Sequence, residues 1–337
     1  MKIAIVNKPG SFSDRWLEYC KKNNIPYKEV NPYASDIVEQ VRDCDAFMWH
    51  FHHLSYKDAL FAKQLLFSIQ QSGKKVFPDF SSAWHFDDKV GQKYLLESID
   101  APFIPSYVFY TKQEALKWIE QTTFPKVFKL RGGAGASNVK LVHTKREAKK
   151  IIKKAFSKGF KQSDSISKFK ERLRKYKSGQ SNFVDVLKGI VRIFIKDEYS
   201  KMHSPEKGYV YFQEFIPNNK FDTRLVVIGG EKAFAEKRYT RPNDFRASGS
   251  GVFSFDNIDE RIVRLGFKVA ELLKLQSIAF DFIYNEENEP VIVEISYAFG
   301  IKGVSNCPGY WTKDLQWHEG THFDFCGWMV ENLINNK

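Results

Sequence analysis

Hydrophobic and polar positions follow two different periods along the first 85 residues. Short apolar runs are typical of buried strands and lie at residues 3–6, 27–30, 45–52 and 74–78. Amphipathic stretches with helical periodicity separate them at about residues 13–23 and 56–71. Strands that alternate with helices predict a parallel sheet covered by helices. The first strand is not followed by GxGxxG, so a dinucleotide site is not supported.

Three segments follow from the same pattern. Pro78 and the Ser81–Ser82 pair mark the end of a first α/β domain, which we expect to span residues 1–85. A second α/β segment is expected over residues 86–205, interrupted by a basic insertion at about 145–181. From Tyr209 onward strands and polar turns dominate. We therefore expect residues 206–337 to form a third segment that contains a hairpin and ends in an aromatic tail.

Residues 277–300 contain the clearest hairpin, with two alternating strands around the turn Asn-Glu-Glu-Asn-Glu-Pro. If Tyr284 pairs with Val291, then Asp281 faces Glu294, and the opposite face is wholly apolar (Phe280, Phe282, Tyr284, Val291, Val293 and Ile295). Facing carboxylates repel each other, and a divalent cation removes the repulsion. Oxygen ligands favour Mg²⁺ or Mn²⁺. We interpret Asp281 and Glu294 as metal ligands; an exposed hairpin with two solvated acids is the alternative.

A glycine-rich turn follows an apolar strand in FPKVFKLRGGAGASN, residues 124–138. Small residues let backbone N–H groups approach phosphate oxygens, and Lys129 adds a positive charge beside them. The turn is not a Walker loop, because no GK[ST] ends it. An ordinary hairpin turn would also explain it.

Arginines recur on the strands that follow residue 209. Asp222 and Arg224 alternate within one strand-like run, and Arg238 and Arg246 lie on the next segments. Guanidinium groups suit carboxylate and phosphate oxygens, so converging arginines indicate an anionic ligand with developing charge. Scattered surface arginines are the alternative.

The chain is basic overall, and one segment carries most of its net positive charge. The chain has 337 residues, 52 Lys and Arg, 40 Asp and Glu, and a net charge of +12. Residues 145–177 alone hold 14 basic and 3 acidic residues. A solvated helical insertion is our preferred interpretation, with Phe169, Leu173 and Tyr176 at helical spacing. A positive rim for an acidic acceptor or polyanion is the second, and nucleic acid is disfavoured because no nucleic-acid motif accompanies the charge.

Cellular location follows from the cysteines and the apolar runs. The four cysteines form neither a disulfide framework nor a paired CxxC site. No apolar run is long enough for a membrane span, and the first residues do not read as a secretory signal. We therefore expect a cytoplasmic protein.

In this order, the motifs resemble those of the ATP-grasp superfamily, especially its glutamate-ligase-like branch. The matching pieces are Asp88-Lys89 opening a helix, Lys129 with RGGAGAS, QEFI, FDTRLVVIGG, NDFR, and finally Asp281 with Glu294. The likeness spans about residues 86–300. It implies an α/β and α+β architecture, in which two α+β subdomains grip ATP after a small parallel α/β domain. Residues 86–205 would be the lid-side subdomain and residues 206–337 the C-terminal one.

The resemblance also implies roles for the candidate nucleotide-binding residues. Lys89 and Lys129 would hold the ATP phosphates. The loop from Arg131 to Ser137 would close over those phosphates, and its expected contacts are Gly132, Gly133, Gly135 and Ser137. The hinge against adenine would be Gln213, Glu214, Phe215 and Ile216. Asp222 would bind the ribose.

The catalytic residues implied are arginines. Arg224, with Arg238 or Arg246, would stabilise the γ-phosphate and an acyl phosphate, while Asp281 and Glu294 would bind Mg²⁺ or Mn²⁺. Relatives follow the second carboxylate with Asn two residues later, but here Ser296 stands at that position, which leaves a second metal in question.

The activity implied is ATP-dependent ligation of a carboxylate to an amine through an acyl phosphate. The acceptor would be a small molecule, a peptide or a saccharide, and an acidic one would suit the basic segment. An ATP-grasp kinase and a polyanion-binding protein with a degenerate nucleotide site are the alternatives. Relatives form dimers and tetramers, so a homo-oligomer is an open expectation.

Two groups of histidines are further candidate sites. Residues 318–322 read HEGTH, which fits HExxH, but Gly320 disfavours a helix and the extended zinc-protease pattern fails. We interpret the tail as packed against the acceptor side, where His318 or Glu319 could contact substrate, with His322 nearby. His50, His52 and His53 follow a buried strand at the end where α/β sheets bind ligands. We interpret these three as loop histidines with ordinary partners rather than acceptor contacts.

Overall fold

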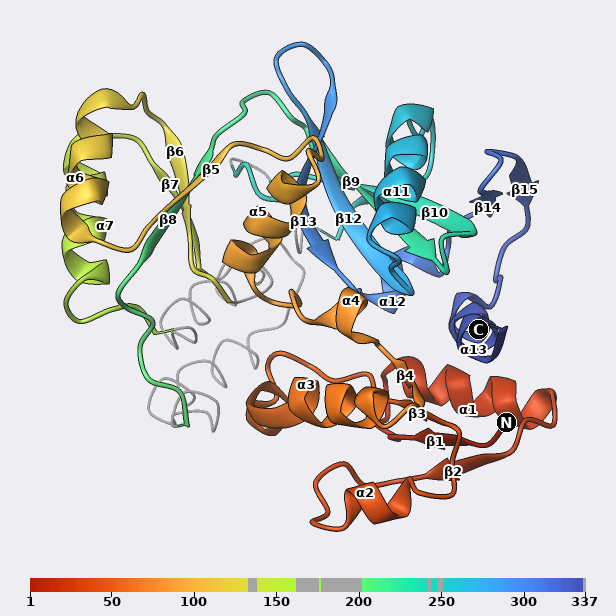
Figure 1. Cartoon of the computed structure of the whole chain (residues 1–337). Coiled ribbons are helices and arrows are strands. Elements are labelled where there is room, and N and C mark those ends of the chain that lie inside the picture. The colour runs from red at the N-terminus through yellow and green to blue at the C-terminus, as the bar shows by residue number, and fades with distance from the viewer. Residues whose placement is uncertain (133–137, 162–175, 177–201, 242–243, 248–250, 336–337) are drawn as a thin grey trace.

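The computed structural model contains three β-sheets (Figure 1). It describes residues 1–132, 138–161, 176, 202–241, 244–247 and 251–335. Within those residues, no helix combines the length and the apolar character that crossing a membrane requires.

The first sheet is parallel, as the alternation of strands and helices predicts. Its strand order is β2-β1-β3-β4, with β1 at Ile3–Ile5, β2 at Tyr27–Glu29, β3 at Ala46–Met48 and β4 at Lys75–Phe77. The helices are α1 (Phe12–Lys22), α2 (Ile37–Gln40), α3 (Tyr56–Gln71) and α4 (Phe80–Ala83). Successive strand residues face opposite ways: Ile5 and Met48 pack against Trp16 of α1, whereas Phe47 packs against Leu66 of α3. Both faces are therefore covered.

The second sheet is antiparallel and has the order β5-β8-β6-β7. Its strands are β5 (Ser106–Phe109), β6 (Lys126–Lys129), β7 (Val139–Val142) and β8 (Val210–Glu214). Helices α6 (Lys112–Gln121) and α7 (Lys145–Ala155) lie side by side on one face (Figure 1). Thr111 and Thr144 cap these helices by accepting a backbone N–H in the first turn. Strand β8 belongs here, so this sheet extends past the boundary expected at residue 205.

The third sheet has the strand order β13-β12-β9-β10-β14-β15, and β11 pairs with β10. The strands are β9 (Phe221–Ile228), β10 (Lys232–Tyr239), β11 (Phe253–Ser254), β12 (Ser277–Tyr284), β13 (Pro290–Ser296), β14 (Gly309–Thr312) and β15 (Trp317–Glu319). Helix α11 (Glu260–Leu272) packs on the face that presents Leu225, Val227 and Phe280. On the opposite face, Asp222 and Arg224 of β9 and Asp281 of β12 line a cavity, whereas Val226 and Ile228 pack into the core shared with α1 and α13.

Helices α5 (Lys89–Ser98), α12 (Ile301–Val304) and α13 (Phe325–Asn335) pack against strands of the first and third sheets. Gln92 of α5 accepts the backbone N–H of Ile295 on β13 at 3.2 Å. Helix α13 packs against α1, which brings the C-terminal end onto the first domain. The Tyr297 hydroxyl, buried in the first domain, donates to the carbonyl of Phe51 at 2.6 Å. The first domain is thus held against the end of the hairpin.

The structure describes only part of the basic segment. Its first portion is α7, where Glu120 pairs with Lys145 and Lys149 at 2.9 Å each. The amphipathic helix expected around Phe169 and Leu173 lies outside the described residues.

Candidate active site

A cavity of about 740 Å³ lies where the three sheets meet. Segments far apart in the sequence contribute to its wall, from the loop at Lys8 through Lys89 and Lys129 to the hairpin at Glu294. Of the residues expected at the site, those that line it are Lys89, Lys129, Gln213, Glu214, Phe215, Ile216, Asp222, Arg224, Arg238, Arg246, Asp281 and Glu294. Gly133, Gly135 and Ser137 lie outside the described residues.

The two carboxylates of the hairpin face each other as the sequence predicts, although the pairing of the strands near the turn differs from the expected one. Asp281 pairs with Glu294. At the turn, however, Tyr284 pairs with Pro290 instead of the expected Val291. A β-bulge between Asp281 and Phe282 absorbs one residue and restores the pairing.

The bulge also overturns the expected apolar face. Phe282 and Ile292 are fully buried in the core beneath α11. Val293 instead lines the cavity together with Glu294, so two consecutive side chains of β13 contribute to the same wall. Val291 also leaves the expected face: it pairs with Ile283 and is only partly buried.

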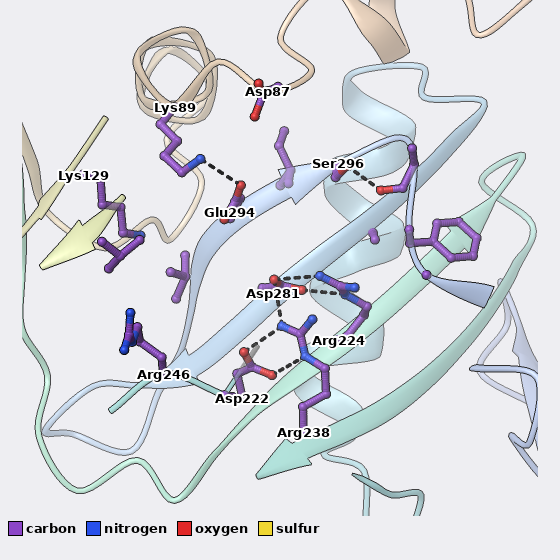
Figure 2. Close-up of a pocket in the computed structure, with 18 of the residues that line it drawn as sticks. Asp87, Lys89, Lys129, Asp222, Arg224, Arg238, Arg246, Asp281, Glu294 and Ser296 are labelled. Carbon is purple, nitrogen blue, oxygen red and sulfur yellow. Dashed lines mark hydrogen bonds and ion pairs between the residues drawn. The ribbon is translucent and has the colours of Figure 1, made fainter. Parts of the chain in front are cut away.

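Four ionisable residues stand in one row across four neighbouring strands: Glu294, Asp281, Arg224 and Glu236. Arg224 holds Asp281 through Nε to Oδ1 at 2.8 Å and through a second nitrogen to Oδ2 at 3.0 Å (Figure 2). Arg238 reaches the same Oδ2 at 2.8 Å. Burial disfavours a charged carboxylate, but the two guanidinium groups outweigh it and lower the pKa of Asp281.

Asp222 and Arg238 form the next row, opposite each other on β9 and β10. Both carboxylate oxygens of Asp222 accept from Arg238 at 2.6 Å. Burial nevertheless raises the pKa of Asp222, against the lowering effect of Arg238. The expected ribose ligand is therefore tied into the arginine network in this structure.

The two lysines expected to hold phosphates are both buried on the cavity wall, but they differ in their partners. Lys89 Nζ lies 3.3 Å from Glu294 Oε1 (Figure 2). Burial by itself would lower the pKa of Lys89, but the neighbouring Glu294 helps raise it above its ordinary value. Lys129 has no carboxylate within ion-pair distance among the residues that the structure describes, and burial lowers its pKa to about 8. Lys129 is thus a poorly compensated cation facing the cavity.

The start of the glycine-rich loop is anchored by contacts that the sequence did not reveal. The Tyr209 hydroxyl accepts the backbone N–H of Arg131 at 2.6 Å and donates to Glu206. The backbone N–H of Lys89 donates to the Arg131 carbonyl at 2.9 Å. These contacts connect the loop at Arg131 and Gly132 directly to the helix that carries Lys89. Because Tyr209 lies outside every motif, no sequence signal pointed to it.

The expected hinge lies on β8 and just after it. Gln213 is buried, and its side-chain amide donates to Ser106 at 3.0 Å. Glu214 accepts from Lys126 at 2.7 Å. Arg246 donates a hydrogen bond to Asp244 at 2.6 Å and also lines the cavity.

Glu236 is a second residue that the sequence analysis missed. It is 2% exposed, and its Oε2 is buried with no hydrogen-bond partner among the described residues. Burial raises its pKa to about 7, against the lowering effect of Arg224. A β-carbon at Gly303 would lie 2.0 Å from that oxygen, so a larger residue there would require the Glu236 carboxylate to move.

The HExxH alternative is wrong. His318 and Glu319 lie on strand β15, and His322 has a φ of 63°, so the two histidines are not one helical turn apart. The His318 ring stacks on Tyr310 at 5.1 Å, away from the cavity wall. Neither His318 nor Glu319 lines the cavity, which also corrects their expected place at the acceptor side.

The donor set fits a magnesium–nucleotide better than a metal held by protein alone. Among the described residues, no group of three or more His, Cys, Asp or Glu could hold an ion. Asp281 and Glu294 are two facing carboxylates, although Arg224 and Arg238 hold both oxygens of Asp281 in this structure. Mg²⁺ is commonly bound by one or two carboxylates plus phosphate oxygens and water. The Ser296 hydroxyl donates to the Ala298 carbonyl at 2.6 Å, so it is already engaged.

Comparisons with known proteins agree with this arrangement. The model of the RimK-like ATP-grasp domain matches residues 184–310. A RimK domain protein ATP-grasp from Sphaerobacter thermophilus is 16% identical, with a TM-score of 0.58, over 99% of this chain and 100% of that one. No curated protein matches.

Several of the similar solved structures contain nucleotides. D-alanine–D-alanine ligase from Bacillus anthracis, complexed with ATP, is 13% identical with a TM-score of 0.53, over 89% of this chain and 87% of that one. The biotin carboxylase domain of 2-oxoglutarate carboxylase from Hydrogenobacter thermophilus, with MgADP and bicarbonate, is 12% identical with a TM-score of 0.59, over 100% and 70%. The chain therefore has the ATP-grasp fold, and its residues 184–310 are similar to the RimK-like ATP-grasp domain.

Proposed function

We propose that the protein is an ATP-dependent ligase that joins a carboxylate to an amine through an acyl phosphate. The observation that carries the proposal is the cavity itself, which brings two buried lysines, an arginine pair and two facing carboxylates onto one wall. The neighbours that contain ATP or MgADP have the same fold and support ATP and Mg²⁺ as the cofactors.

The reaction has two steps. A carboxylate oxygen of the first substrate attacks the γ-phosphorus of ATP, and ADP leaves with the electron pair of the broken bond. The amine nitrogen of the second substrate then attacks the acyl carbon, phosphate leaves, and the nitrogen loses a proton to give the amide. Catalysis of such steps relies on positioning and charge stabilisation.

This chain's own residues divide those tasks. Lys89 and Lys129 bind phosphate oxygens, and the buried site strengthens each contact by excluding water. Arg224 and Arg238 offer guanidinium groups for the charge that develops on the transferred phosphoryl group. Asp281 and Glu294 would hold Mg²⁺, which supplies neutralisation of the triphosphate when it is bound.

The first test is thermal stability with and without MgATP or a non-hydrolysable analogue. A ligand at about 100 times its Kd adds about 2.7 kcal/mol to the free energy of unfolding, which raises the melting temperature by several degrees. Glu294→Gln should lose the magnesium-dependent part of that rise. Glu319→Gln, an exposed carboxylate outside the cavity, is the matched control and should keep it. An equal rise in both variants would contradict the metal assignment.

The second test separates the ligase from a kinase. Hydroxylamine captures an acyl phosphate as a hydroxamate, so a ligase given ATP and its carboxylate substrate should yield hydroxamate without the amine. A screen of amino acids and sugar acids that follows ADP release supplies the substrate. ADP release with a stable phosphorylated product and no hydroxamate would establish the kinase instead.

A further inference from the structure

One end of the cavity is built by the first domain and takes no part in the roles assigned above. Lys8 and His50 follow strands β1 and β3, which are parallel neighbours, so the two residues emerge at the same edge of the sheet. Both line the cavity, as does His52. This end lies against Phe299 and Gly300, beyond the row of carboxylates and arginines.

The backbone determines which nitrogen of His50 carries the proton. The Phe12 N–H donates to Nδ1 at 3.1 Å, and the ring stacks on Phe12 with centroids 3.9 Å apart. Burial lowers the pKa of His50 to about 3, so the ring is neutral at pH 7. A neutral ring that accepts at Nδ1 must carry its hydrogen on Nε2. His50 is therefore a hydrogen-bond donor on its free side.

His52 is held in the same way. The Leu54 N–H donates to its Nδ1 at 3.1 Å, and burial lowers its pKa to about 4. Its Nε2 thus also carries a hydrogen. The structure shows no hydrogen bond from Nε2 of His50 or His52 to another residue that it describes. Two imidazole N–H groups are consequently available to a ligand.

Lys8 adds a positive charge beside the two rings. Its ammonium lowers the pKa of both His50 and His52, after the larger effect of burial. Its nearest carboxylate is Asp58, 3.8 Å away. That carboxylate already accepts from the His52 backbone N–H at 2.8 Å and from the Ser55 hydroxyl at 2.7 Å. Asp58 therefore holds the loop in place and compensates Lys8 only in part.

Two imidazole N–H groups without an acceptor and one partly compensated ammonium suit the recognition of an oxyanion. We propose that Lys8, His50 and His52 bind an anionic group, a carboxylate or a phosphate, that the acceptor substrate carries away from its reacting atom. The inference rests on the proposed function for the identity of that substrate. It replaces our interpretation of these histidines as ordinary loop residues.

His53 connects this end to the reacting centre. Its ring stacks on His52 with centroids 4.4 Å apart, and both its nitrogens are buried without a hydrogen-bond partner among the described residues. Lys89 and Glu294 both influence its pKa, which burial lowers to about 4. An acceptor that spans from the Lys8 end to Glu294 thus passes along a continuous wall.

The experiment uses imidazole ¹⁵N resonances of the intact protein, which has eight histidines. His50→Gln and His52→Gln assign the two rings. A non-hydrolysable MgATP analogue first fills the phosphate subsite, and the thermal shift reports its binding. Sodium acetate and sodium phosphate are then added separately at constant ionic strength. Failure of the analogue to bind would count against the proposed function alone, since acetate can still be titrated into the free protein.

We expect Nε2–H tautomers for both rings and a saturable change in their resonances with one of the two anions. Tighter acetate binding identifies a carboxylate-bearing acceptor, and tighter phosphate binding identifies a phosphorylated one. Lys8→Met should weaken binding about tenfold or more, as expected for a charge-assisted hydrogen bond. Lys112→Met, outside the cavity on α6, should not. Nδ1–H tautomers, no saturable change with either anion, or unchanged binding in Lys8→Met would overturn the proposal.

Discussion

Replacing Lys129 with methionine should stabilise the nucleotide-free protein while removing its affinity for ATP. Lys129 is 7% exposed, lies on β6 and faces the cavity (Figure 2). An ammonium that leaves water without a close carboxylate is unfavourable. Methionine has a similar length, carries no charge and fits an apolar wall. The nucleotide's phosphates supply the compensation that the folded chain lacks.

The magnitude follows from the pKa of Lys129, which burial lowers from 10.5 to about 8. At about 1.4 kcal/mol per pH unit, the buried charge costs the fold about 3 kcal/mol at pH 7. Between pH 8 and 10.5 the unfolded chain binds the proton more tightly than the folded one does, so the wild type gains stability with rising pH. The advantage of Lys129→Met should therefore shrink by about 1.4 kcal/mol per pH unit across that window.

Urea unfolding of both proteins at pH 7 and pH 9.5 measures this difference, because other titrating groups are common to both and cancel. Lys126→Met is the matched control. Lys126 lies on the same strand and is equally buried, but it pairs with Glu214 at 2.7 Å. Its removal leaves a partly buried carboxylate without its partner, so this variant should lose about 1–3 kcal/mol.

Two results would refute the reasoning. A destabilised Lys129→Met at pH 7 would mean that the ammonium is well compensated in the folded chain. A pH-independent difference between wild type and variant would mean that packing, and not charge, separates them. Titration with MgATP completes the assay, since the variant should bind it far more weakly.

Three further perturbations test neighbouring features. Glu236→Gln should be more stable than wild type by up to about 3 kcal/mol at pH 8 but equal to it at pH 4. Burial raises the pKa of Glu236 from 4.5 to about 7, so wild-type stability is lost as pH rises from the first value to the second. Urea unfolding at both pH values checks this, and the same difference in free energy of unfolding at pH 4 and pH 8 would contradict it. Tyr209→Phe removes the hydroxyl that accepts the Arg131 N–H and should weaken MgATP binding by about 1 kcal/mol, measured by calorimetric titration; unchanged affinity would dismiss the anchoring role. Gly266→Ala would place a β-carbon 2.1 Å from Cδ2 of the fully buried Leu225 and should cost about 1–3 kcal/mol by thermal unfolding; an unchanged melting temperature would contradict this close packing.

Local pattern was enough for the four strands and the two long helices of the first domain, although it missed the one-turn helices α2 and α4. The predicted helix at residues 56–71 is α3, Tyr56–Gln71, because Ser55 caps it and its periodicity is uninterrupted. The facing of Asp281 and Glu294 was also predictable, since side chains alternate with period two and a polar turn joins the strands. The bulge beside Asp281 was not, because an extra residue in a ladder leaves no mark in a run of alternating apolar residues.

By itself, the sequence determined the alternation of strands and helices in the first domain, the resemblance to ATP-grasp proteins and most of the charged residues that line the cavity, Lys8 and Asp87 being the exceptions. These depend on periodicity and motif, which are local properties. Only the tertiary structure decided how the charges pair: Asp222 with Arg238 across β9 and β10, Asp281 with Arg224, and Lys129 with no carboxylate in the described chain. Pairing depends on the register between strands that are far apart in the sequence. It also depends on burial, which sets the strength of each charge–charge interaction.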